Sequence, residues 1–445
     1  MRTGTFARAV AVSGATLLAL TACGGGGDAG EDTGGGGGDA SSEKQVNIYG
    51  SDGNMGNALG ADFDEPGSLA GMKGTTPLTE LSGDFTDRLL AINPQLEDYN
   101  YAGETYDAVV LIALAAQSAG TNQATAFAPY INGLTTGGDK CTDFASCLEI
   151  LNAGGDVDYD GVSGPLAFTD AGEPAYASFG LLQFGEDNVL DESLTEYVFG
   201  GDEANATTAA PPAPVAPGAT GEPLVIGTLL PETGNLAFLG PPEIAGVQLA
   251  INEVNAASGV LGAPVQLVTG DSGDTSTDTA TQTVDRLLQS NVNAIIGAAS
   301  SSVSLTVIDT IVNAGVVMFS PANTSDQFTT YNDRGLYFRT APPDVLQARA
   351  LADVIGADGN NTVGILALND SYGTGLAENI KENLISDGLP EDSIRDIIYD
   401  PQAANFDSEV QQMADFNPDA IVVIGFEESS RILSALNAQG IGPQR

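Results

Sequence analysis

Apolar residues follow two alternating patterns along residues 224–445. Short continuous apolar runs such as "LVIGTLL" (224–230), "NAIIGA" (293–298) and "DAIVVIG" (419–425) indicate strands that are buried on both faces. Between these runs the apolar positions take helical spacing, and Ile244, Val247, Ile251 and Val254 lie on one face of such a helix. The alternation predicts parallel sheets covered by helices, and its restart after "FRTAPPDV" (338–345) predicts two such lobes.

A second block of globular sequence covers residues 45–199. It begins with a strand and turn, "QVNIYGSDG" (45–53), continues with a helix predicted to be amphipathic, "YDAVVLIALAAQSAG" (106–120), and ends in a β pattern, "YASFGLLQFG" (176–185). Residues 200–223 are rich in Pro and Ala and separate the two blocks. Their composition predicts an extended, hydrated linker.

The first 23 residues read as an export signal outside the fold. Arg2 and Arg8 flank a polar start, and an apolar stretch at 9–20 is too short to span a bilayer. The stretch ends in "LTAC", which resembles a bacterial lipobox and implies cleavage before Cys23 and a lipid on its sulfur. The alternative is an ordinary secretory signal with an accidental cysteine. The Gly- and Asp-rich residues 24–44 then form a flexible tether.

Composition excludes several classes of function. The chain has 59 acidic and 14 basic residues, a net charge of −45, which argues against nucleic acid or an anionic membrane surface as a partner. It contains no His, so catalytic triads and zinc sites built on imidazole are excluded. Cys141 and Cys147 either form a disulfide that closes a small loop or remain as two buried thiols. We expect no metal site and no cofactor.

Four segments carry a family resemblance when residues 224–445 are placed before residues 45–199. They are "GTLLPETGNLAFLG" (227–240), "IIGAASSSVS" (295–304), "MFSPANTSDQF" (318–328) and "LNDSYGTGLAENI" (368–380). In this order nearly all of both blocks resembles the type 1 periplasmic binding proteins, in particular the leucine/isoleucine/valine-binding family that serves ABC importers. The resemblance implies an α/β fold of two doubly wound parallel-sheet lobes joined by a hinge.

The order of the two blocks indicates a circular permutation. In the family, a helix like "SSRILSALNAQG" (429–440) leads directly into a strand like "VNIYG" (46–50), so residues 46–49 should lie in the same sheet as residues 420–424. The expected division is signal 1–23, tether 24–44, lobe 2 at 45–76, 169–199 and 342–445, lobe 1 at 77–168 and 224–341, and linker 200–223. The alternatives are an assembly or gene-order artefact, and two half-proteins that pair between chains.

The resemblance also implies which residues hold a zwitterionic amino acid. Ser301, with Ser302 beside it, and Thr324 would bind the carboxylate, Ala322 would contribute backbone, and Asp52 would pair with the ammonium group. Asp52 stands where Glu is common and is one methylene shorter. Side chains that would close over the ligand or line its pocket are Tyr372, Phe426, Phe238 and Leu239.

Hinge closure would trap the ligand between lobes connected near residues 75–77, 168–174 and 340–343. The expected protein is exported, lipid-anchored at the outer face of the bacterial cytoplasmic membrane or periplasmic, and delivers an amino acid, branched-chain ones leading, to an ABC permease. Short amides or urea are alternative ligands, and a soluble sensor of the same fold is an alternative function.

An enzyme is not expected. "GDSGD" (270–274) is similar to a serine-protease motif, but the chain has no His to act as base. No GxGxxG follows the strand at 225–229, so a dinucleotide site is not expected either.

Overall fold

A computed structural model describes residues 45–215 and 218–443 of the chain. It contains one sheet of five strands, one of seven and one of two. We call the five-stranded sheet with its helices lobe 1, and the seven-stranded sheet with its helices lobe 2. Cys23 and the tether fall outside the described residues.

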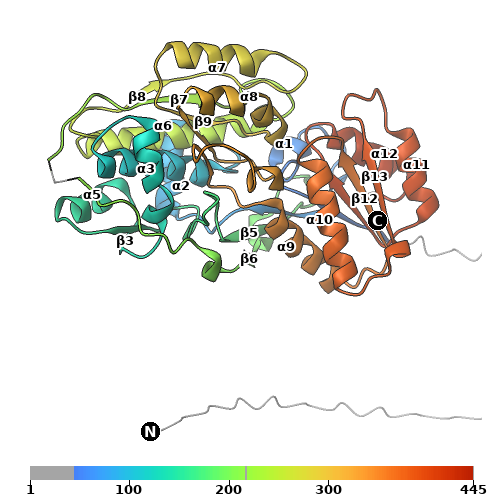
Figure 1. Cartoon of the computed structure of the whole chain (residues 1–445). Coiled ribbons are helices and arrows are strands. Elements are labelled where there is room, and N and C mark those ends of the chain that lie inside the picture. Colours follow the sequence, from blue (N-terminus) through green and yellow to red (C-terminus); the bar gives the residue numbers. More distant parts are fainter. Residues whose placement is uncertain (1–44, 216–217, 444–445) are drawn as a thin grey trace, which may run out of the picture. The chain divides into compact units, whose positions relative to one another are not determined.

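The lobe 1 sheet is parallel throughout. Its strands, in spatial order, are β11 (Tyr337–Arg339), β10 (Val317–Ser320), β9 (Ala294–Gly297), β7 (Val225–Leu229) and β8 (Gln266–Val268). Helices α7 (Thr279–Gln289) and α8 (Ser301–Asn313) lie on one side of it, and α3 (Ala102–Ala119) and α6 (Gly240–Ala256) on the other (Figure 1). The remaining elements of this lobe are α2 (Gly83–Ile92), α4 (Ala124–Phe127), α5 (Phe144–Asn152), β3 (Asp139–Cys141) and β4 (Val157–Tyr159).

The lobe 2 sheet combines strands from distant parts of the sequence. Its order is β13 (Ile394–Tyr399), β12 (Val363–Leu368), β14 (Ala420–Ile424), β1 (Asn47–Gly50), β2 (Lys73–Pro77), β5 (Tyr176–Gln183) and β6 (Glu196–Gly201). The first five are parallel, whereas β5 and β6 are antiparallel to their neighbours. Its helices are α1 (Asn57–Gly60), α9 (Asp344–Ala357), α10 (Gly373–Ser386), α11 (Asp407–Phe416) and α12 (Ser429–Gln439).

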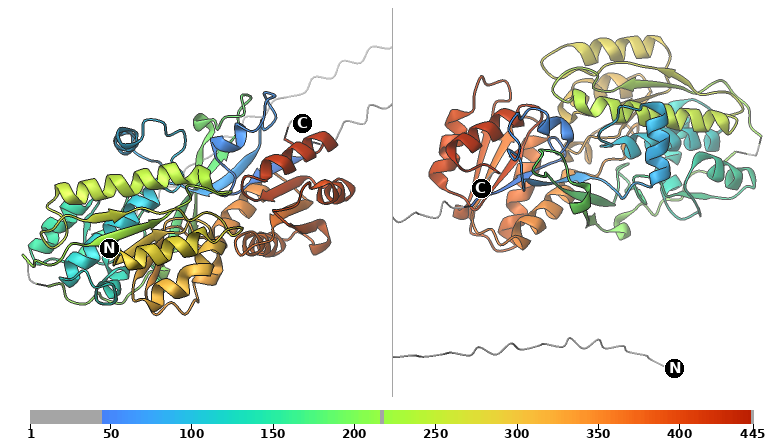
Figure 2. Two further views of the ribbon diagram at one scale, coloured as in Figure 1. Left: turned by 90° about the horizontal axis from the view of Figure 1, so that it is seen from above. Right: turned by 180° about the vertical axis from the view of Figure 1, so that it is seen from behind.

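The predicted neighbour of β14 is confirmed. β1 pairs with it in parallel, with Asn47 opposite Ala420 and Tyr49 opposite Val422. In Figure 2 the blue start of the described chain lies among the red elements of its end. Tyr49 and Ile48 are buried in the core of lobe 2, as expected for a central parallel strand.

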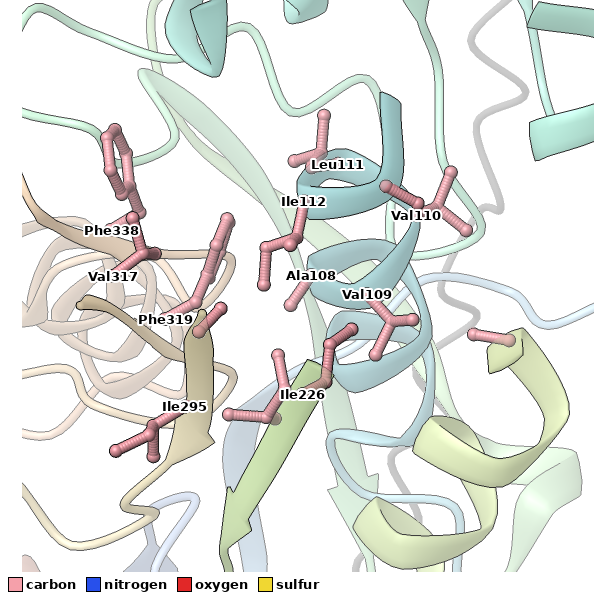
Figure 3. Close-up of a cluster of buried hydrophobic side chains, with 14 of the residues drawn as sticks. Ala108, Val109, Val110, Leu111, Ile112, Ile226, Ile295, Val317, Phe319 and Phe338 are labelled. Atoms are coloured by element: carbon pink, nitrogen blue, oxygen red, sulfur yellow. The ribbon is translucent and has the colours of Figure 1, made fainter. Parts of the chain in front are cut away.

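Helix α3 corrects the expectation of an amphipathic helix. Of its 18 residues, all but Gln117 and Ala119 are buried, so it is a core helix without a solvent face. Figure 3 shows Ala108, Val109 and Ile112 directed toward the strand residues of lobe 1. The uninterrupted aliphatic run at 108–116 is the sequence feature that matches this environment, because a helix apolar on every side must be covered on every side.

Most of the described linker is exposed. Its first residues belong to β6, and Thr207 is buried, with its N–H bonded to the Phe168 carbonyl at 2.7 Å. Further along, the N–H of Val215 donates to the Ser118 carbonyl at 2.8 Å. These two backbone hydrogen bonds attach an otherwise exposed segment to lobe 1.

Three further connections run between the sheets, at the places predicted for the hinge. β2 leads into α2, β4 leads into β5, and β11 leads into α9. Thr340, after β11, donates to the Glu104 carbonyl at 2.8 Å, and Phe168 forms an antiparallel bridge with Pro174. Short crossings of this kind leave two lobes that can rotate about a few backbone bonds.

Candidate functional site

Asp52 lies in the turn after β1, between the two lobes. Its carboxylate is buried and accepts hydrogen bonds from the Tyr101 hydroxyl on Oδ2 and the Tyr372 hydroxyl on Oδ1, both at 2.7 Å. Tyr101 directly precedes α3 of lobe 1, and Tyr372 directly precedes α10 of lobe 2. Burial raises the pKa of Asp52, and the hydrogen bonds from the two tyrosines oppose that rise. A cationic group would favour the ionised carboxylate in this environment.

Gly53 is set by packing. A Cβ at this position would lie 2.6 Å from the Gly425 carbonyl oxygen and 2.9 Å from the ring of Phe426. Only glycine allows the turn to approach the end of β14 this closely. Gly53 therefore lets this turn pack closely against the loop after β14, and the preceding Asp52 is buried there.

In the serine-rich loop after β9, one serine caps the following helix and the next serine does not. Ser300 caps α8, because its side chain accepts the N–H of Val303 at 3.3 Å. Ser301 is therefore not needed as a cap. Its buried Oγ accepts the N–H of Ser325 at 3.3 Å, which ties this loop to the loop after β10. The loop after β10 carries Ala322 and Thr324, both buried.

One cavity brings most of the expected residues together. It measures about 20 Å³ and is lined by residues from both lobes. Among them are seven of the nine expected ligand residues, namely Asp52, Ser301, Ala322, Thr324, Tyr372, Phe426 and Leu239. A volume of this size suffices for about one water molecule, so an organic solute can enter only if the lobes separate. We call it the head-group cavity.

Two expected residues lie elsewhere. Ser302 does not line the head-group cavity, because its Oγ lies 2.8 Å from Ser371 Oγ and 3.1 Å from Asp370 Oδ2 across the lobe boundary. Phe238 lines a neighbouring cavity of about 250 Å³. Ser325 adds a further bond between the lobes, donating to the Ser371 carbonyl at 3.0 Å. Ser302 and Ser325 thus stabilise the closed arrangement of the lobes.

Tyr101 was not expected at the site. It lies in the loop sequence "YNYAGE", where nothing in the pattern distinguishes it from a surface aromatic, yet its side chain is buried against Asp52. Leu236, Ala299 and Ser300 also line the head-group cavity without having been singled out. They lie within the same loops as the residues singled out from the sequence.

Asp344 is a second acid beside the site that sequence reasoning missed. It is the first residue of α9, fully buried, and its N–H bonds the Thr324 carbonyl at 2.7 Å. Neither carboxylate oxygen has a hydrogen-bond partner among the described residues. Burial and then repulsion from Asp52 and Asp326 raise its pKa well above the usual range, and the nearby Thr324 hydroxyl lowers it in part without reaching hydrogen-bond geometry. The sequence "PPDV" reads as an ordinary helix start, which concealed it.

The head-group cavity is lined by one acid, Asp52, and by hydroxyl side chains, among them those of Ser300, Ser301, Thr324 and Tyr372. No Lys or Arg is among the residues that line it. Ser301 and Thr324 lie at the end of the parallel strands near the N-terminus of α8, where backbone N–H groups favour an anion. Asp52 lines the same cavity from lobe 2, and its carboxylate favours a cation. The arrangement is suited to a small molecule that carries both charges.

Other expected features have their own outcomes. Cys141 and Cys147 are joined by a disulfide with a Cα–Cα distance of 5.2 Å. Within residues 45–215 and 218–443 no group of three or more His, Cys, Asp or Glu side chains is placed to hold a metal ion. No helix in the same residues is long and apolar enough to cross a membrane.

Two α/β lobes with crossing connections and a polar cavity between their loops define the class of two-lobed binding folds. Residues 223–445 match the family described as "Periplasmic binding protein", and residues 47–187 match the family described as "Receptor family ligand binding region". The chain belongs to the type 1 periplasmic binding proteins, in their branched-chain amino acid family. Membership of this family implies an extracytoplasmic location.

Relatives match only part of their length. Leu/Ile/Val-binding protein homolog 8 of Brucella abortus is 30% identical over 230 residues, which are 49% of this chain and 55% of that protein. Leu/Ile/Val-binding protein BraC3 of Rhizobium johnstonii is 30% identical over 172 residues, 38% of this chain and 46% of that protein. The chain thus spans about half the length of the curated relatives it matches. These relatives are named as binding proteins and not as enzymes.

Solved structures give similar partial matches. A leucine-binding protein from Thermotoga maritima is 25% identical with a TM-score of 0.40, covering 45% of this chain and 55% of that one. The branched-chain amino acid transporter substrate-binding protein from Streptococcus pneumoniae, in complex with isoleucine, is 26% identical with a TM-score of 0.43, covering 49% and 62%.

Proposed function

We propose that the protein is an extracytoplasmic, lipid-anchored solute-binding protein that captures an amino acid between its lobes and delivers it to an ABC permease. Branched-chain amino acids are the first candidates, because two of the relatives are named Leu/Ile/Val-binding proteins. The observation that carries the proposal is the convergence of Asp52, Ser301 and Thr324 on the head-group cavity. An acid for the ammonium group and hydroxyl donors for the carboxylate in one small cavity fit a zwitterion.

The ammonium group would lie at Asp52. This carboxylate already accepts two tyrosine hydroxyls, and an ammonium group can donate to it or displace one of them. Asp344 lies close enough to Asp52 for repulsion between the two to raise its pKa, and burial favours its protonated, uncharged form. The ionised Asp52 disfavours a neutral amide, urea or a purely anionic solute at this position, because such a ligand would leave the buried carboxylate without a counter-charge.

The carboxylate of the ligand would lie at Ser301 and Thr324. Two hydroxyls and the backbone N–H groups of their loops supply donors, and burial makes such bonds stronger than in water. A ligand bound this way contacts both lobes and so stabilises the closed conformation relative to the open one. The closed form would then dock on the permease, with the lipid on Cys23 keeping the protein at the membrane.

Isothermal titration calorimetry on the protein without its signal tests the proposal. Leucine, isoleucine and valine are expected to bind, whereas urea, acetamide and benzoate are expected to bind at least tenfold more weakly. Tight binding of benzoate or urea with no response to any amino acid would refute it. A sensor of the same fold would bind the same ligands, so a co-purification with permease in detergent distinguishes the two functions.

The circular permutation is a further part of the proposal. It is supported by the parallel pairing of β1 with β14, residues that are far apart in the sequence but adjacent in the sheet. Helix α12 follows β14 and would serve as the crossover to β1 in an unpermuted chain. On this proposal the linker at 200–223 joins the ancestral termini.

Reversing the rotation should preserve the protein. A variant that starts at Leu224, runs to Pro443, continues through a short Gly/Ser connection to Gln45 and ends at Gly201 is expected to fold with the same circular dichroism spectrum. Its ligand affinity should stay within about threefold, since every strand keeps its neighbours. Light scattering provides the second readout. If the parent protein is a dimer and the rotated form fails to fold, pairing between chains replaces permutation.

A further inference from the structure

A larger cavity adjoins the head-group cavity. It measures about 250 Å³ and lies between α1, the turn after β1, the first loop of lobe 1 and the loop after β14. Gly53 and Phe426 line both cavities, so they form the partition between them. We call the larger space the side-chain cavity.

The side chain of this partition is the ring of Phe426. The ring of Phe426 stacks on that of Tyr372 with centroids 5.6 Å apart and an angle of 9°. Tyr372 reaches Asp52 through its hydroxyl, so the same pair of rings borders the place proposed for the ammonium group. A ligand whose charged end occupies the head-group cavity would therefore direct its side chain past Phe426 into the larger space.

The walls of the side-chain cavity are mostly apolar in effect. Leu59, Phe238 and Phe426 contribute hydrophobic surface. Asn54 also lines it, but its amide nitrogen already donates to the Val423 carbonyl at 2.9 Å and Ser429 Oγ at 3.1 Å, and its oxygen accepts the N–H of Ser51 at 3.0 Å. Because the amide group of Asn54 already has hydrogen-bond partners within the protein, it does not require a polar group on the ligand. Replacing water at these walls with an apolar group of the ligand is favourable, because it removes apolar surface from water.

The volume decides which side chains fit. An apolar cavity of about 150 Å³ holds a benzene molecule, so about 250 Å³ accepts an aromatic ring with room for the connecting methylene. A valine or isoleucine side chain would leave much of this space unfilled and forgo the corresponding contacts. The aromatic lining residues Phe238 and Phe426 favour a ring further, because aromatic rings pack well in stacked or edge-on arrangements.

The charges at the cavity exclude one class of ligand. Asp62 and Glu427 are its charged lining residues, both exposed, and no Lys or Arg lines it. An acidic side chain would bring a third carboxylate beside them without a counter-charge. From size, apolar walls and charge together we infer that the site takes amino acids with large uncharged side chains, the aromatic ones above all, in preference to small branched-chain ones and to acidic ones. This inference rests on the proposed amino-acid binding function.

Calorimetry with phenylalanine, valine and glutamate tests the inference. The protein should bind phenylalanine at least tenfold more tightly than valine, and glutamate most weakly. Ala58→Trp fills the side-chain cavity from an exposed position of α1 that lines it, and is expected to weaken phenylalanine binding at least tenfold while valine affinity changes less than threefold. Ala58→Leu is a second, smaller filling should the tryptophan variant not fold.

Ala61→Trp is the matched control. Ala61 is exposed at the C-terminal end of the same helix and does not line the cavity, so this variant should bind both ligands as the parent does. Valine binding as tight as phenylalanine, or an Ala58→Trp variant that binds phenylalanine normally, overturns the inference while amino-acid binding stands. Binding of no amino acid at all overturns the proposed function and the inference with it.

Discussion

Replacing Arg339 with methionine is expected to lower the free energy of unfolding by about 3–5 kcal/mol. Arg339 is fully buried at the end of β11 and is the largest of the fully buried side chains. Its Nε donates to Glu173 Oε2 at 3.0 Å and its Nη2 to the same oxygen at 2.5 Å. Methionine keeps most of the apolar stem but leaves the Glu173 carboxylate buried without its counter-charge, which is the costly part of the change.

The same guanidinium holds the loop that carries Thr324. Its Nη1 donates to the carbonyls of Asn323 at 3.1 Å and Ser325 at 2.9 Å, on either side of that residue. Glu173 lies in the segment that connects β4 with β5 and so crosses between the lobes. Loss of Arg339 should therefore weaken ligand binding as well as stability, because both the loop and the crossing lose their anchor.

Urea denaturation followed by circular dichroism measures the stability effect, with Arg349→Met as the matched control. Arg349 pairs with Asp353 and Asp387, but its side chain is 32% exposed and the two acids are more so. Exposed ion pairs of this kind contribute about 0–1 kcal/mol. An Arg339→Met variant no less stable than Arg349→Met would show that Glu173 finds another partner or becomes protonated at little cost.

Replacing Asp52 with alanine is expected to weaken amino-acid binding at least tenfold, about 1.4 kcal/mol. The carboxylate is the group proposed to face the ammonium ion, and its removal leaves Asp344 as the remaining acid near that position. Asp52→Asn separates charge from shape, because the amide oxygen can still accept a tyrosine hydroxyl. The asparagine variant should show nearly the whole loss if charge is the essential property.

Protonation of Asp52 at low pH should weaken amino-acid binding, as these substitutions do. Burial raises the pKa of Asp52, so the carboxyl group of the free protein becomes protonated at a higher pH than an exposed aspartate would. The ammonium ion prefers the ionised form, and affinity should therefore be constant at higher pH and fall as the pH drops through the pKa of Asp52. In Asp52→Asn this dependence should be reduced to whatever Asp344 contributes.

Calorimetric titration across pH measures both effects, and Asp64→Ala serves as the control. Asp64 is an exposed acid of the same lobe and lines neither cavity, so its removal should leave affinity and pH dependence unchanged. Unchanged affinity in Asp52→Ala would remove this residue from the site and leave Asp344 as the principal ammonium partner.

Most of the fold could be predicted from the continuous apolar runs that form the strands. Runs such as 294–297 and 420–424 are buried on both faces, and this environment leaves few alternatives to a parallel sheet. The resemblance then located the loops after those strands, which is why Ser301 and Thr324 line the expected cavity. The carboxyl ends of parallel strands lie at the same edge of a sheet, so the order of the strands determines which loops are neighbours.

What could not be predicted depends on contacts between distant residues. The pattern of residues 176–185 indicates a strand, but its antiparallel pairing with β2 is fixed by the crossing from β4, which leaves no local signal. Asp344 reads as a first-turn acid, and only the packing of α9 against Thr324 removes it from water. Ser302 faces the other lobe because Ser300 takes the capping position and so sets the phase of α8.

The central position of β1 also affects how the protein is made. Synthesis proceeds from the amino end, so β1 emerges long before β14, its partner across the register Asn47 to Ala420. Until then one edge of β1 has no permanent neighbour, and closing so long a loop is slow. The lobe 2 sheet can thus be completed only after β14, a strand near the end of the described chain, has left the ribosome.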